Sequence, residues 1–439
     1  MFANQRRSIL IAVFALLILI PGCLGLPGRS QPMTQEQKAL FLSSFDEMTR
    51  MIEETFWDPA YLQECWGDLK GECRQQVEDA NSADEARSAM RRLLASLEMS
   101  HFGVIPDSAS QELSGSPSEG EAGMILRVSD GRAIVVRLEA GGAAEKAGIQ
   151  PGDEILKVGE RELAPRLKEW GESGSRYLPI QALQSACSGE PGTERDYLVR
   201  NAQEDRTVTL TFQPPSDDYP RVGFGNIAPV PLKLEKRILE DDILYLRLGM
   251  FLGPMQVMPW FENAIQEHRD AKGMILDLRG NPGGLGLMAC GLAGWLIEDE
   301  GFELGTMKTK ANDMNFSVNP RLDGWVKPVA LLIDEGSAST SEIMAQGLRD
   351  IGRVRLFGRT TAGAALPSVL VKLPNGDILQ YAMADYVSVS GKRMEGVGVE
   401  PDEYIEVDPD QIREFGDPAL KKAAYWILGK PGGPRSQIR

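Results

Sequence analysis

Two segments in the second half of the chain share one form: an apolar strand, a tight turn of small residues, and the first turn of a helix. The first segment runs from Ile275 to Gly284 and ends in Arg-Gly-Asn-Pro-Gly-Gly. The second runs from Leu331 to Glu342 and carries Gly-Ser-Ala-Ser-Thr-Ser after its strand. Short apolar runs that alternate with helical patterns are typical of strands joined by helices. These segments therefore predict an α/β architecture for this part of the chain.

The α/β pattern extends from residue 219 to about residue 430. A hairpin is expected near its end, because the Asn-Gly pair at 375–376 stands between two alternating strands. The expected elements are strands at 243–248, 274–278, 329–333, 354–357, 369–373 and 378–381, and helices at 254–269, 284–297 and 341–349. The fold class predicted for the whole chain is multidomain α/β.

The first 23 residues have the form of an export signal. Arg6 and Arg7 precede an apolar run, Ile9–Ile20, that is too short to cross ~30 Å of hydrocarbon as a helix. The run ends in Ile-Pro-Gly-Cys, which resembles the lipid-attachment motif of bacterial lipoproteins and makes Cys23 the expected lipidation site. We expect a protein exported to the periplasm or cell surface and anchored in a bacterial membrane by that lipid. An ordinary cleaved signal with an incidental cysteine is the alternative.

Residues 34–105 predict a helical N-terminal module. Large apolar side chains recur at three- and four-residue steps from Phe41 to Phe56, which is one face of an amphipathic helix. A second helix is expected to open at Ser82, with two acidic residues in its first turn.

Composition narrows the choice of partners and cofactors. The chain has 63 acidic and 47 basic side chains, a formal net charge of −16, and an acidic surface repels nucleic acid. Its five cysteines include no CxxC pair, so a structural zinc site is not expected, and no spacing suggests another metal or an organic cofactor. In an oxidising compartment Cys65 and Cys73 could pair, whereas Cys187 and Cys290 have apolar neighbours and are expected to be buried thiols.

A β-rich domain is expected at residues 113–215. Its segment Ala140–Glu162 places a small helix before a Pro-Gly-Asp turn and a strand, and it resembles a PDZ domain. The resemblance implies that a loop near Gly123, Met124 and Ile125 binds the terminal carboxylate of a peptide, while an edge strand pairs with the peptide. A PDZ-shaped spacer without a ligand is the alternative.

The serine-rich turn can be explained in two ways from its residues alone. A hydroxyl between a strand and a helix N-terminus lies beside free amides, which favours a nucleophile and its oxyanion. Ser339 or Ser341 could equally cap the helix that follows. The consecutive glycines of the first turn could likewise bind an anion or form only a tight turn.

Four sequence blocks in a fixed order favour the catalytic interpretation of these turns over the structural one. They are DLRGNPGG, DEGSASTSE, GRTTAG and EGVGVEPD. Together with the helical module and the PDZ-like domain, they resemble the tail-specific, or C-terminal-processing, serine proteases. The resemblance runs from about Phe41 to Asp402 and implies a crotonase-like α/β protease core at residues 219–430. It places the nucleophile at Ser339 and the oxyanion hole at the amides of Thr340 and of Gly283 or Gly284.

This sequence lacks the general base of the better-known branch of that family, in which a lysine pairs with the serine. Ala364 stands in the lysine's place, and Lys372, eight residues on, is a poor substitute. A second branch resembles the core of tricorn protease and uses histidine and glutamate. Its pattern maps the base to His101, with Glu395 orienting it and Ser100 bridging the two by hydrogen bonds.

The sequence thus predicts an exported serine endopeptidase that cleaves proteins or peptides and holds their free C-termini on its PDZ-like domain. No nucleic acid partner is expected, and the membrane contact is the lipid anchor. A catalytically inactive peptide-binding scaffold of the same fold is the main alternative, because a serine without a base is a weak nucleophile. A weaker alternative is a binder of hydrophobic small molecules.

Overall fold

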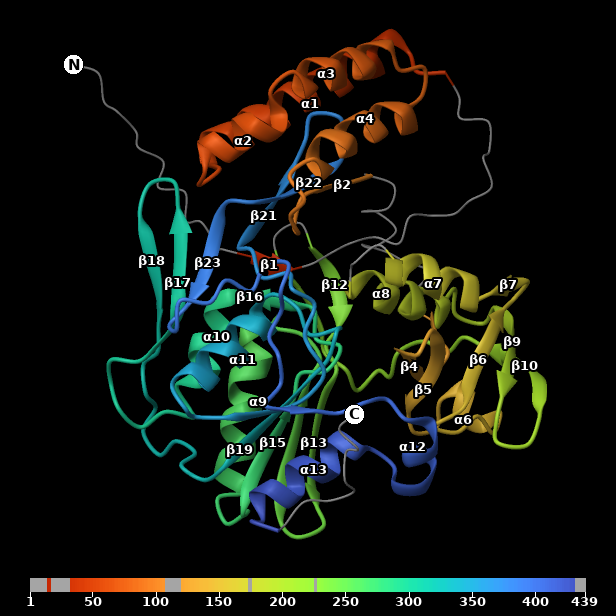
Figure 1. Ribbon diagram of the computed structural model, residues 1–439, viewed down its shortest axis with the longest axis vertical. Coiled ribbons are helices and arrows are strands. Elements are labelled where there is room, and N and C mark those ends of the chain that lie inside the picture. The colour runs from red at the N-terminus through yellow and green to blue at the C-terminus, as the bar shows by residue number, and fades with distance from the viewer. Residues whose placement is uncertain (1–13, 17–31, 107–119, 173–175, 225–226, 431–439) are drawn as a thin grey trace.

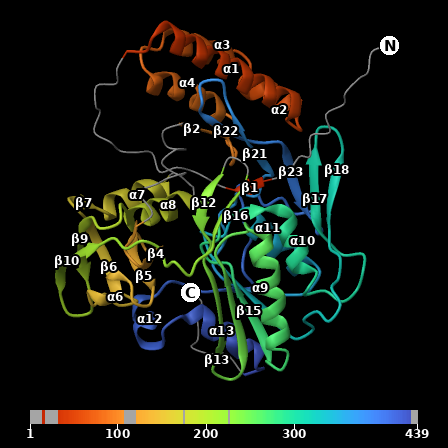
Figure 2. The same cartoon turned by 180° about the vertical axis from the view of Figure 1, so that it is seen from behind.

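The structure is a computed structural model that describes residues 14–16, 32–106, 120–172, 176–224 and 227–430 (Figure 1). A helical module lies at one end of the molecule, the PDZ-like domain lies at one side, and both contact a central α/β core. The view from behind shows the same arrangement, with the C-terminal helix α12 (Pro409–Phe415) below the PDZ-like domain and α13 (Pro418–Ile427) beside the lower part of the core (Figure 2). The multidomain α/β fold class is confirmed.

The core is built on a six-stranded sheet. In spatial order its strands are β13 (Leu234–Leu239), β14 (Ile243–Leu248), β15 (Gly273–Asp277), β19 (Val329–Ile333), β20 (Arg355–Gly358) and β24 (Glu403–Tyr404). From β14 onward all neighbours are parallel, and β13 pairs antiparallel with β14. The carboxyl ends of the parallel strands therefore meet at one edge, where the loops before the next helices gather.

Both faces of this sheet are covered by helices. Alternate side chains of the same strands point to opposite faces, so β14, β15 and β19 contribute to two separate cores. One face packs against α9 (Pro254–Glu267), α10 (Gly286–Ala293) and α11 (Thr340–Asp350). The other face packs against α13. Strands buried on both faces need nearly continuous apolar runs, which is why the sequence identifies them.

The helical module consists of α1 (Gln35–Thr55), α2 (Pro59–Trp66), α3 (Leu69–Asp79) and α4 (Ala83–Ala95), followed by strand β2 (Gly103–Ile105). A hairpin of the core, β21 (Ser368–Lys372) and β22 (Ile378–Ala382), completes the module's hydrophobic core, and β2 pairs with β22. Arg87 of α4 also forms an ion pair of 2.9 Å with the fully buried Asp377 of the hairpin turn. The disulfide considered between Cys65 and Cys73 is not formed: both are free thiols, Cys73 buried on α3 and Cys65 half-buried on α2. Cys187 and Cys290 are buried thiols, as expected.

The PDZ-like domain is a sheet of five strands in the order β10 (Asp205–Thr211), β9 (Glu194–Arg200), β6 (Glu154–Val158), β5 (Arg132–Leu138) and β4 (Met124–Ser129). Strand β7 (Arg161–Glu162) also pairs with β6, and a two-stranded ladder joins β3 (Gly120–Glu121) to β8 (Ser188–Gly189). The helices are α6 (Ala143–Lys146), α7 (Ala164–Glu172) and α8 (Tyr177–Ala186). Strand β4 is an edge strand, which suits the capture of a peptide by strand addition.

Some elements were not expected from the sequence. These are β13, the pair β11 (Arg221–Phe224) and β12 (Ile227–Pro231), and the sheet β18 (Asp313–Ser317), β17 (Glu303–Thr309) and β23 (Ala384–Ser388). The helix expected over 284–297 starts later and ends earlier, because Gly283–Leu285 forms strand β16 and the helix ends at Ala293.

Strand β16 belongs to a sheet that crosses the edge of the core. Its order is β16, β1 (Phe14–Leu16), β21, β22 and β2. The segment β1, within the expected leader, lies between two strands of the core and pairs antiparallel with both. In the part of the chain that the structure describes, no helix is long and apolar enough to cross a membrane.

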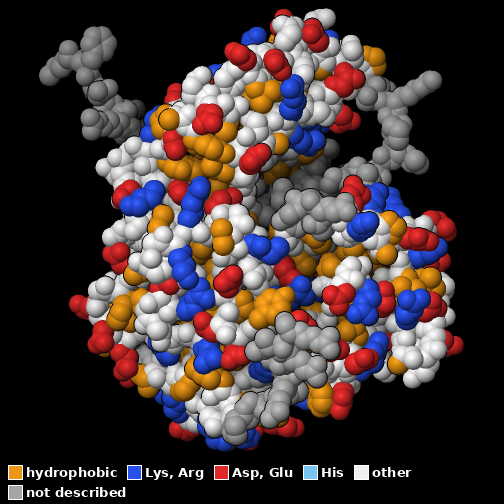
Figure 3. All heavy atoms as spheres, viewed as in Figure 1, with side chains coloured by type: hydrophobic (Ala, Val, Ile, Leu, Met, Phe, Trp, Pro, Cys, Tyr) orange, Lys and Arg blue, Asp and Glu red, His pale blue; other side chains and the backbone are white. Residues whose placement is uncertain are grey.

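The surface carries both signs of charge. On the face shown in Figure 3, acidic and basic side chains are interspersed over the helical module, the core and the PDZ-like domain. The acidic excess of the chain is therefore not gathered into one patch on this face.

Candidate active site

Ser339 is the last residue before helix α11, at the carboxyl end of strand β19. Its side chain is fully buried, and its backbone adopts φ 61° and ψ −117°, a conformation that residues other than glycine rarely adopt. Ser339 is the N-cap residue of α11, so the capping interpretation of this position holds for its backbone. Ser341 does not cap the helix, because its hydroxyl donates to the carbonyl oxygen of Asn281 at 2.9 Å.

The loops after β15 and β19 are tied together by hydrogen bonds. Asp334 Oδ1 accepts the amides of Gly280 at 2.8 Å and Gly336 at 2.9 Å, one from each loop. The carbonyl of Asn281 accepts the amide of Ala338, the residue before Ser339, at 3.0 Å. The two segments that the sequence singled out therefore form one rigid surface around Ser339.

The two glycines proposed for the oxyanion hole differ in what their amides do. The Gly283 amide donates to Asn281 Oδ1 at 2.9 Å, so it is already engaged. Gly284 has φ 141°, and a Cβ there would lie 2.3 Å from the carbonyl oxygen of Phe251. The side chain of Thr340 donates to the carbonyl of Gly284 at 3.0 Å, which brings the first residue of α11 against β16. Gly284 and Thr340 are thus adjacent in space.

His101 lies directly after the helical module, just before β2. Its Nδ1 is 2.6 Å from the hydroxyl oxygen of Ser100, and that hydroxyl donates to Glu395 Oε2 at 2.9 Å. The Ser100 amide donates to Glu395 Oε1 at 2.6 Å, so the carboxylate holds Ser100 at two points. A hydroxyl has one proton, so donation to Glu395 requires Nδ1 of His101 to carry the other, and Nε2 is then an acceptor. Nε2 is buried and has no hydrogen-bond partner among the residues that the structure describes.

Burial shifts the acidity of both ionisable groups of this arrangement. Desolvation lowers the pKa of His101 to about 3, which keeps the imidazole neutral near pH 7. Desolvation also raises the pKa of Glu395 to about 7, against the hydrogen bonds from Ser100 and the Ala365 amide, which lower it. At pH 7 the imidazole is therefore neutral and can accept a proton, while the carboxyl beside it titrates near neutrality.

One carboxylate joins the serine to the loop that faces Glu395. Glu342 is fully buried on α11, and its Oε2 accepts the amides of Ser339 and Ala364, both at 2.9 Å. The next residue, Ala365, donates its amide to Glu395 Oε2 at 3.1 Å. Ser339 and His101 are therefore linked through hydrogen bonds to Glu342 and Glu395 and through the backbone between Ala364 and Ala365. Glu342 was not among the site residues expected from the sequence, although the Ser-x-x-Glu spacing signals a carboxylate that folds back onto the N-cap amide.

The PDZ-like domain contacts this set at the start of α8. Arg176 donates Nε to the carbonyl of Thr361 at 3.0 Å and also donates to the carbonyl of Val397, two residues after Glu395. Tyr177 is buried against Ala338 and Ala364. Ala364, in the place of the lysine of the other branch, is thus packed against an aromatic ring from the neighbouring domain.

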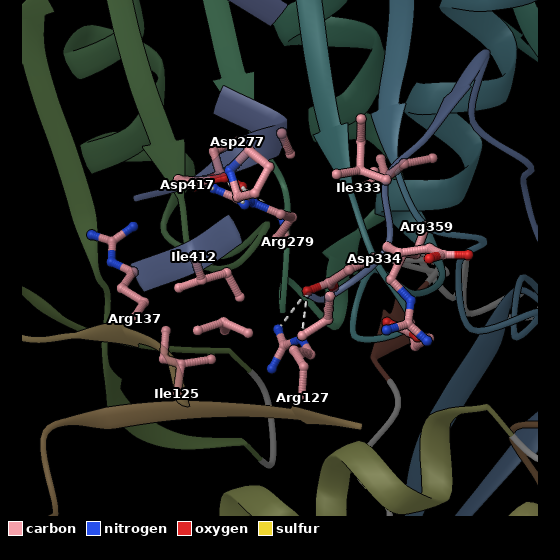
Figure 4. A pocket seen from close by; sticks show the side chains of 18 of the residues that line it. Ile125, Arg127, Arg137, Asp277, Arg279, Ile333, Asp334, Arg359, Ile412 and Asp417 are labelled. Atoms are coloured by element: carbon pink, nitrogen blue, oxygen red, sulfur yellow. Dashed lines mark hydrogen bonds and ion pairs between the residues drawn. The ribbon is translucent and has the colours of Figure 1, made fainter. Parts of the chain in front are cut away.

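A second contact joins strand β4 to the same loops. Arg127 donates Nε to Asp334 Oδ2 at 2.6 Å, and Figure 4 shows this pair in a pocket between the PDZ-like domain and the core. Asp334 is the residue whose other oxygen holds both active-site loops. The pocket is also lined by Ile125 of β4 and by the paired Arg279 and Asp277 of the core.

The remaining candidate residues lie on or next to strands β4 and β21, or outside the described residues. Gly123 has φ 73° at the start of β4, Met124 is buried, and Ile125 is half-buried toward the pocket between the domains. Lys372 is exposed at the end of β21. Cys23 lies outside the described residues.

Comparison with protein families finds two matches. The model described as Peptidase family S41 matches residues 242–405, and the PDZ domain model matches residues 110–165. The first stretch contains Ser339, Glu342 and Glu395, and the second contains Gly123 and Arg127.

Among proteins of known function, the chain is similar to carboxy-terminal processing proteases. It is 23% identical to the carboxy-terminal processing protease CtpA of Bacillus subtilis over 420 residues, 93% of this chain and 79% of that protein. It is 25% identical to a carboxyl-terminal-processing protease of Synechocystis over 429 residues, 95% of this chain and 92% of that protein.

Solved structures support the fold. The photosystem II D1 C-terminal processing protease superposes with a TM-score of 0.54 at 21% identity, covering 86% of this chain and 94% of that one. Mature CPAF superposes with a TM-score of 0.59 at 14% identity, covering 89% of this chain and 98% of that one. At these identities the likeness concerns the fold alone.

Proposed function

We propose that Ser339 is the nucleophile and His101 the general base of this serine-type peptidase, which matches the Peptidase family S41 model over residues 242–405 and the PDZ domain model over residues 110–165. The observation that carries this assignment is the hydrogen-bonded set Glu395–Ser100–His101, which fixes the tautomer and leaves Nε2 of a buried imidazole as an acceptor. Its connection to Ser339 runs through Glu342 and the adjacent amides of Ala364 and Ala365.

In the proposed reaction the Ser339 hydroxyl attacks the carbonyl carbon of the scissile peptide bond. Its proton passes to Nε2 of His101 as the C–O bond forms and the carbonyl electron pair moves to oxygen. The imidazolium then gives that proton to the leaving amine as the C–N bond breaks. Water repeats both steps to release the acyl group from Ser339. Glu395, through Ser100, orients the imidazole and stabilises its charged form.

The developing oxyanion is proposed to be bound by the amides of Thr340 and Gly284. Thr340 begins α11, where a backbone amide has no partner within the helix and the helix dipole favours negative charge. Gly284 is preferred to Gly283, whose amide is already donated to Asn281. Loss of one such donor costs roughly 10²–10³-fold in rate in other hydrolases.

A lysine base is disfavoured by the local packing. At position 364 the alanine methyl group packs against Tyr177 and Ala338. Lys372 is exposed at the end of β21, whereas the side chain of Ser339 is fully buried.

Protein or peptide chains are the substrate class of a peptidase with a PDZ domain. We propose that the substrate backbone adds as a strand between β16 and β21, the place that β1 takes in this structure. There β1 pairs Ala15 with Gly284 and Leu16 with Gly283, so a chain in this position runs beside the proposed oxyanion donor. The proposed role of the PDZ domain is to hold the substrate's free C-terminus at Gly123–Ile125 and along edge strand β4.

The proposed cellular setting follows from the leader. Its basic start, short apolar run and Ile-Pro-Gly-Cys ending support export and a lipid on Cys23. Mass spectrometry of the protein purified from bacterial membranes tests this: a diacylglyceryl group on an N-terminal Cys23 is expected, and a free or internal Cys23 contradicts the proposal.

The function is tested with a soluble form that begins after Cys23. We expect it to cleave an unfolded protein such as casein, and we expect Ser339→Ala and His101→Ala to abolish cleavage. Lys372→Ala is the matched control and should cleave like the parent. Loss with Lys372→Ala but not with His101→Ala would mean that the base is misassigned. Absence of cleavage in the parent, together with C-terminus-dependent peptide binding, would favour the inactive scaffold.

A further inference from the structure

The proposed mechanism leaves one buried ionisable group near Ser339 without a task. Glu342 lies three residues after Ser339 on α11 and is fully buried. A carboxylate in such a place is costly unless hydrogen bonds satisfy its oxygens. Its partners therefore indicate what it is there to hold.

Four donors point at the Glu342 carboxylate. Oε2 accepts the Ser339 and Ala364 amides at 2.9 Å each. Oε1 accepts the Thr361 hydroxyl at 2.5 Å and the Gly363 amide at 2.8 Å. All four donors are electrically neutral. Because none of them pairs with it as a cation would, the arrangement is one of positioning and not a salt bridge.

Helix capping explains only one of the four bonds. A capping glutamate needs to accept the amide of its N-cap residue, here Ser339. The three other donors come from residues 361–364, a turn in a different part of the chain that makes no part of α11. Glu342 therefore ties the nucleophile's backbone to a second segment.

The bond to Ser339 acts on a strained residue. With φ 61° and ψ −117°, Ser339 holds a conformation that persists only when its surroundings enforce it. Fixing the Ser339 amide fixes the orientation of the peptide unit before it. The direction of the Ser339 side chain depends on that backbone.

The second segment leads to the other half of the site. The Thr361 hydroxyl, which donates to Glu342, accepts the Val399 amide at 2.7 Å. Ala365, directly after the residue held by Glu342, donates to Glu395 at 3.1 Å. The Glu342 carboxylate thus connects the backbone of Ser339 to residues 361–365, which in turn contact Glu395 and Val399.

We propose that Glu342 is a positioning residue of this peptidase, holding Ser339 in its strained conformation and in register with the segment that carries Glu395. This inference rests on the proposed roles of Ser339, His101 and Glu395. In it Glu342 touches neither substrate nor the transferred proton. Its removal should therefore reduce kcat and leave substrate binding nearly unchanged.

The primary test is Glu342→Gln in the full chain, which keeps the side chain's size. A glutamine has one acceptor oxygen and an NH₂ group, so at least one of the four donors would face another donor. Displacing catalytic groups by about 1 Å costs ~10²-fold in rate. We expect kcat for a quenched fluorescent peptide to fall by about that factor, with KM within about threefold of the parent.

A matched control separates positioning from general destabilisation. Gln346 lies one turn further along α11, is buried, and bonds Asp350 and Arg349 at 2.5 Å each, away from the serine. Gln346→Leu also removes buried hydrogen bonds, but its kcat per folded molecule should equal that of the parent. Equal losses of kcat in Glu342→Gln and Gln346→Leu, after correction for the folded fraction, would overturn the inference.

A second pair keeps the test decisive if Glu342→Gln does not fold. Thr361→Ser retains the hydroxyl donor to Glu342 and should have the same kcat as the parent. Thr361→Val removes that donor with little change in shape and should lower kcat by about tenfold. Equal kcat values for the two Thr361 variants would contradict the proposal.

The inference and the proposed function fail in different ways. The reaction of Ser339 with a fluorophosphonate, which modifies only an activated serine, is measured alongside peptide cleavage. If Ser339→Ala and His101→Ala abolish both reactions but Glu342→Gln changes neither, the function stands and the positioning role is wrong. If the parent protein neither reacts nor cleaves, the proposed function fails and the inference with it.

Discussion

The two halves of the candidate site are built in different ways. The half around Ser339 consists of two consecutive strand-to-helix turns of one sheet, tied to each other by Asp334 and by the Asn281 carbonyl. The half around His101 joins segments far apart in the chain: Ser100 and Glu395 are separated by 295 positions and meet through two hydrogen bonds. The first half is fixed by the core, whereas the second depends on how the helical module packs on it.

This difference teaches where each half is vulnerable. The serine half lies at the carboxyl ends of strands buried on both faces, so its geometry is enforced by the main hydrophobic core. The histidine half is held by the hairpin β21–β22, which is shared between the core and the helical module, and by PDZ-domain contacts at Arg176. We therefore expect a displacement of the helical module or of the PDZ-like domain to disturb His101 more than Ser339.

The largest expected effect tests whether the two halves act as one unit. Ser339→Ala and His101→Ala should each lower kcat by on the order of 10⁴-fold or more, because the serine is weak without its base. The double variant should lose no more than either single variant, since the second change removes a group that has nothing left to act on. Initial rates at saturating peptide measure this, with fluorophosphonate-treated parent as the background control.

Multiplicative losses in the double variant would show that the halves work independently. That outcome would contradict the assignment of His101 as the base for Ser339.

The sequence predicts the serine half well because its signals are local. The apolar strands before each turn, the consecutive glycines and the Ser-Ala-Ser run are all contiguous, and β15, β19 and α11 lie close to their expected bounds. The helix expected to start at Gly284 is delayed because that glycine is in strand β16 instead. Strands such as β17 and β18 escaped prediction because their residues are largely polar and half-exposed, without a buried run to mark them.

The contacts between the PDZ-like domain and the core cannot be predicted from sequence spacing. Arg176 meets the carbonyl of Thr361 across 185 positions, and Arg127 meets Asp334 across 207. No periodicity links such residues, because only the packing of whole domains brings them together. His101, Ser100 and Glu395 came from a family resemblance, and their roles stay predictions. Glu342 had a local signal in its Ser-x-x-Glu spacing, but that spacing alone indicates only a helix cap.

A smaller effect is expected at the contact that docks the helical module. Arg87→Ala leaves the fully buried Asp377 without its ion-pair partner, and breaking a buried pair costs about 3–5 kcal/mol of unfolding free energy. Asp84→Ala is the matched control: Asp84 lies 3.6 Å from the same arginine, but its side chain is 82% exposed, so its removal should change stability little. Urea denaturation followed by circular dichroism measures both, and equal effects would show that the buried contact does not hold the module.

The smallest expected effect is on pH dependence, and it distinguishes the carboxyl of the histidine half from its imidazole. The working form has neutral His101 and ionised Glu395. Burial raises the pKa of Glu395 to about 7 and lowers that of His101 to about 3, so as pH falls the carboxylate is protonated first, while the imidazole stays neutral. The ionised fraction of Glu395 falls about tenfold per pH unit below its pKa, so kcat/KM should fall likewise below pH 7. The apparent pKa belongs to the coupled group and not to one residue.

Glu395→Gln should be less active at pH 8 but nearly independent of pH from 5 to 8, because its amide does not titrate. Glu335→Gln is the matched control: burial raises the pKa of Glu335 as well, but its charged partner is Arg359, at 2.6 Å, and it makes no contact with Ser100. That variant should keep the decline below pH 7. Rate profiles of the three proteins, each checked for folding at every pH, decide the matter. A decline that persists near pH 7 in Glu395→Gln would assign it to another group and remove the carboxyl from the base's support.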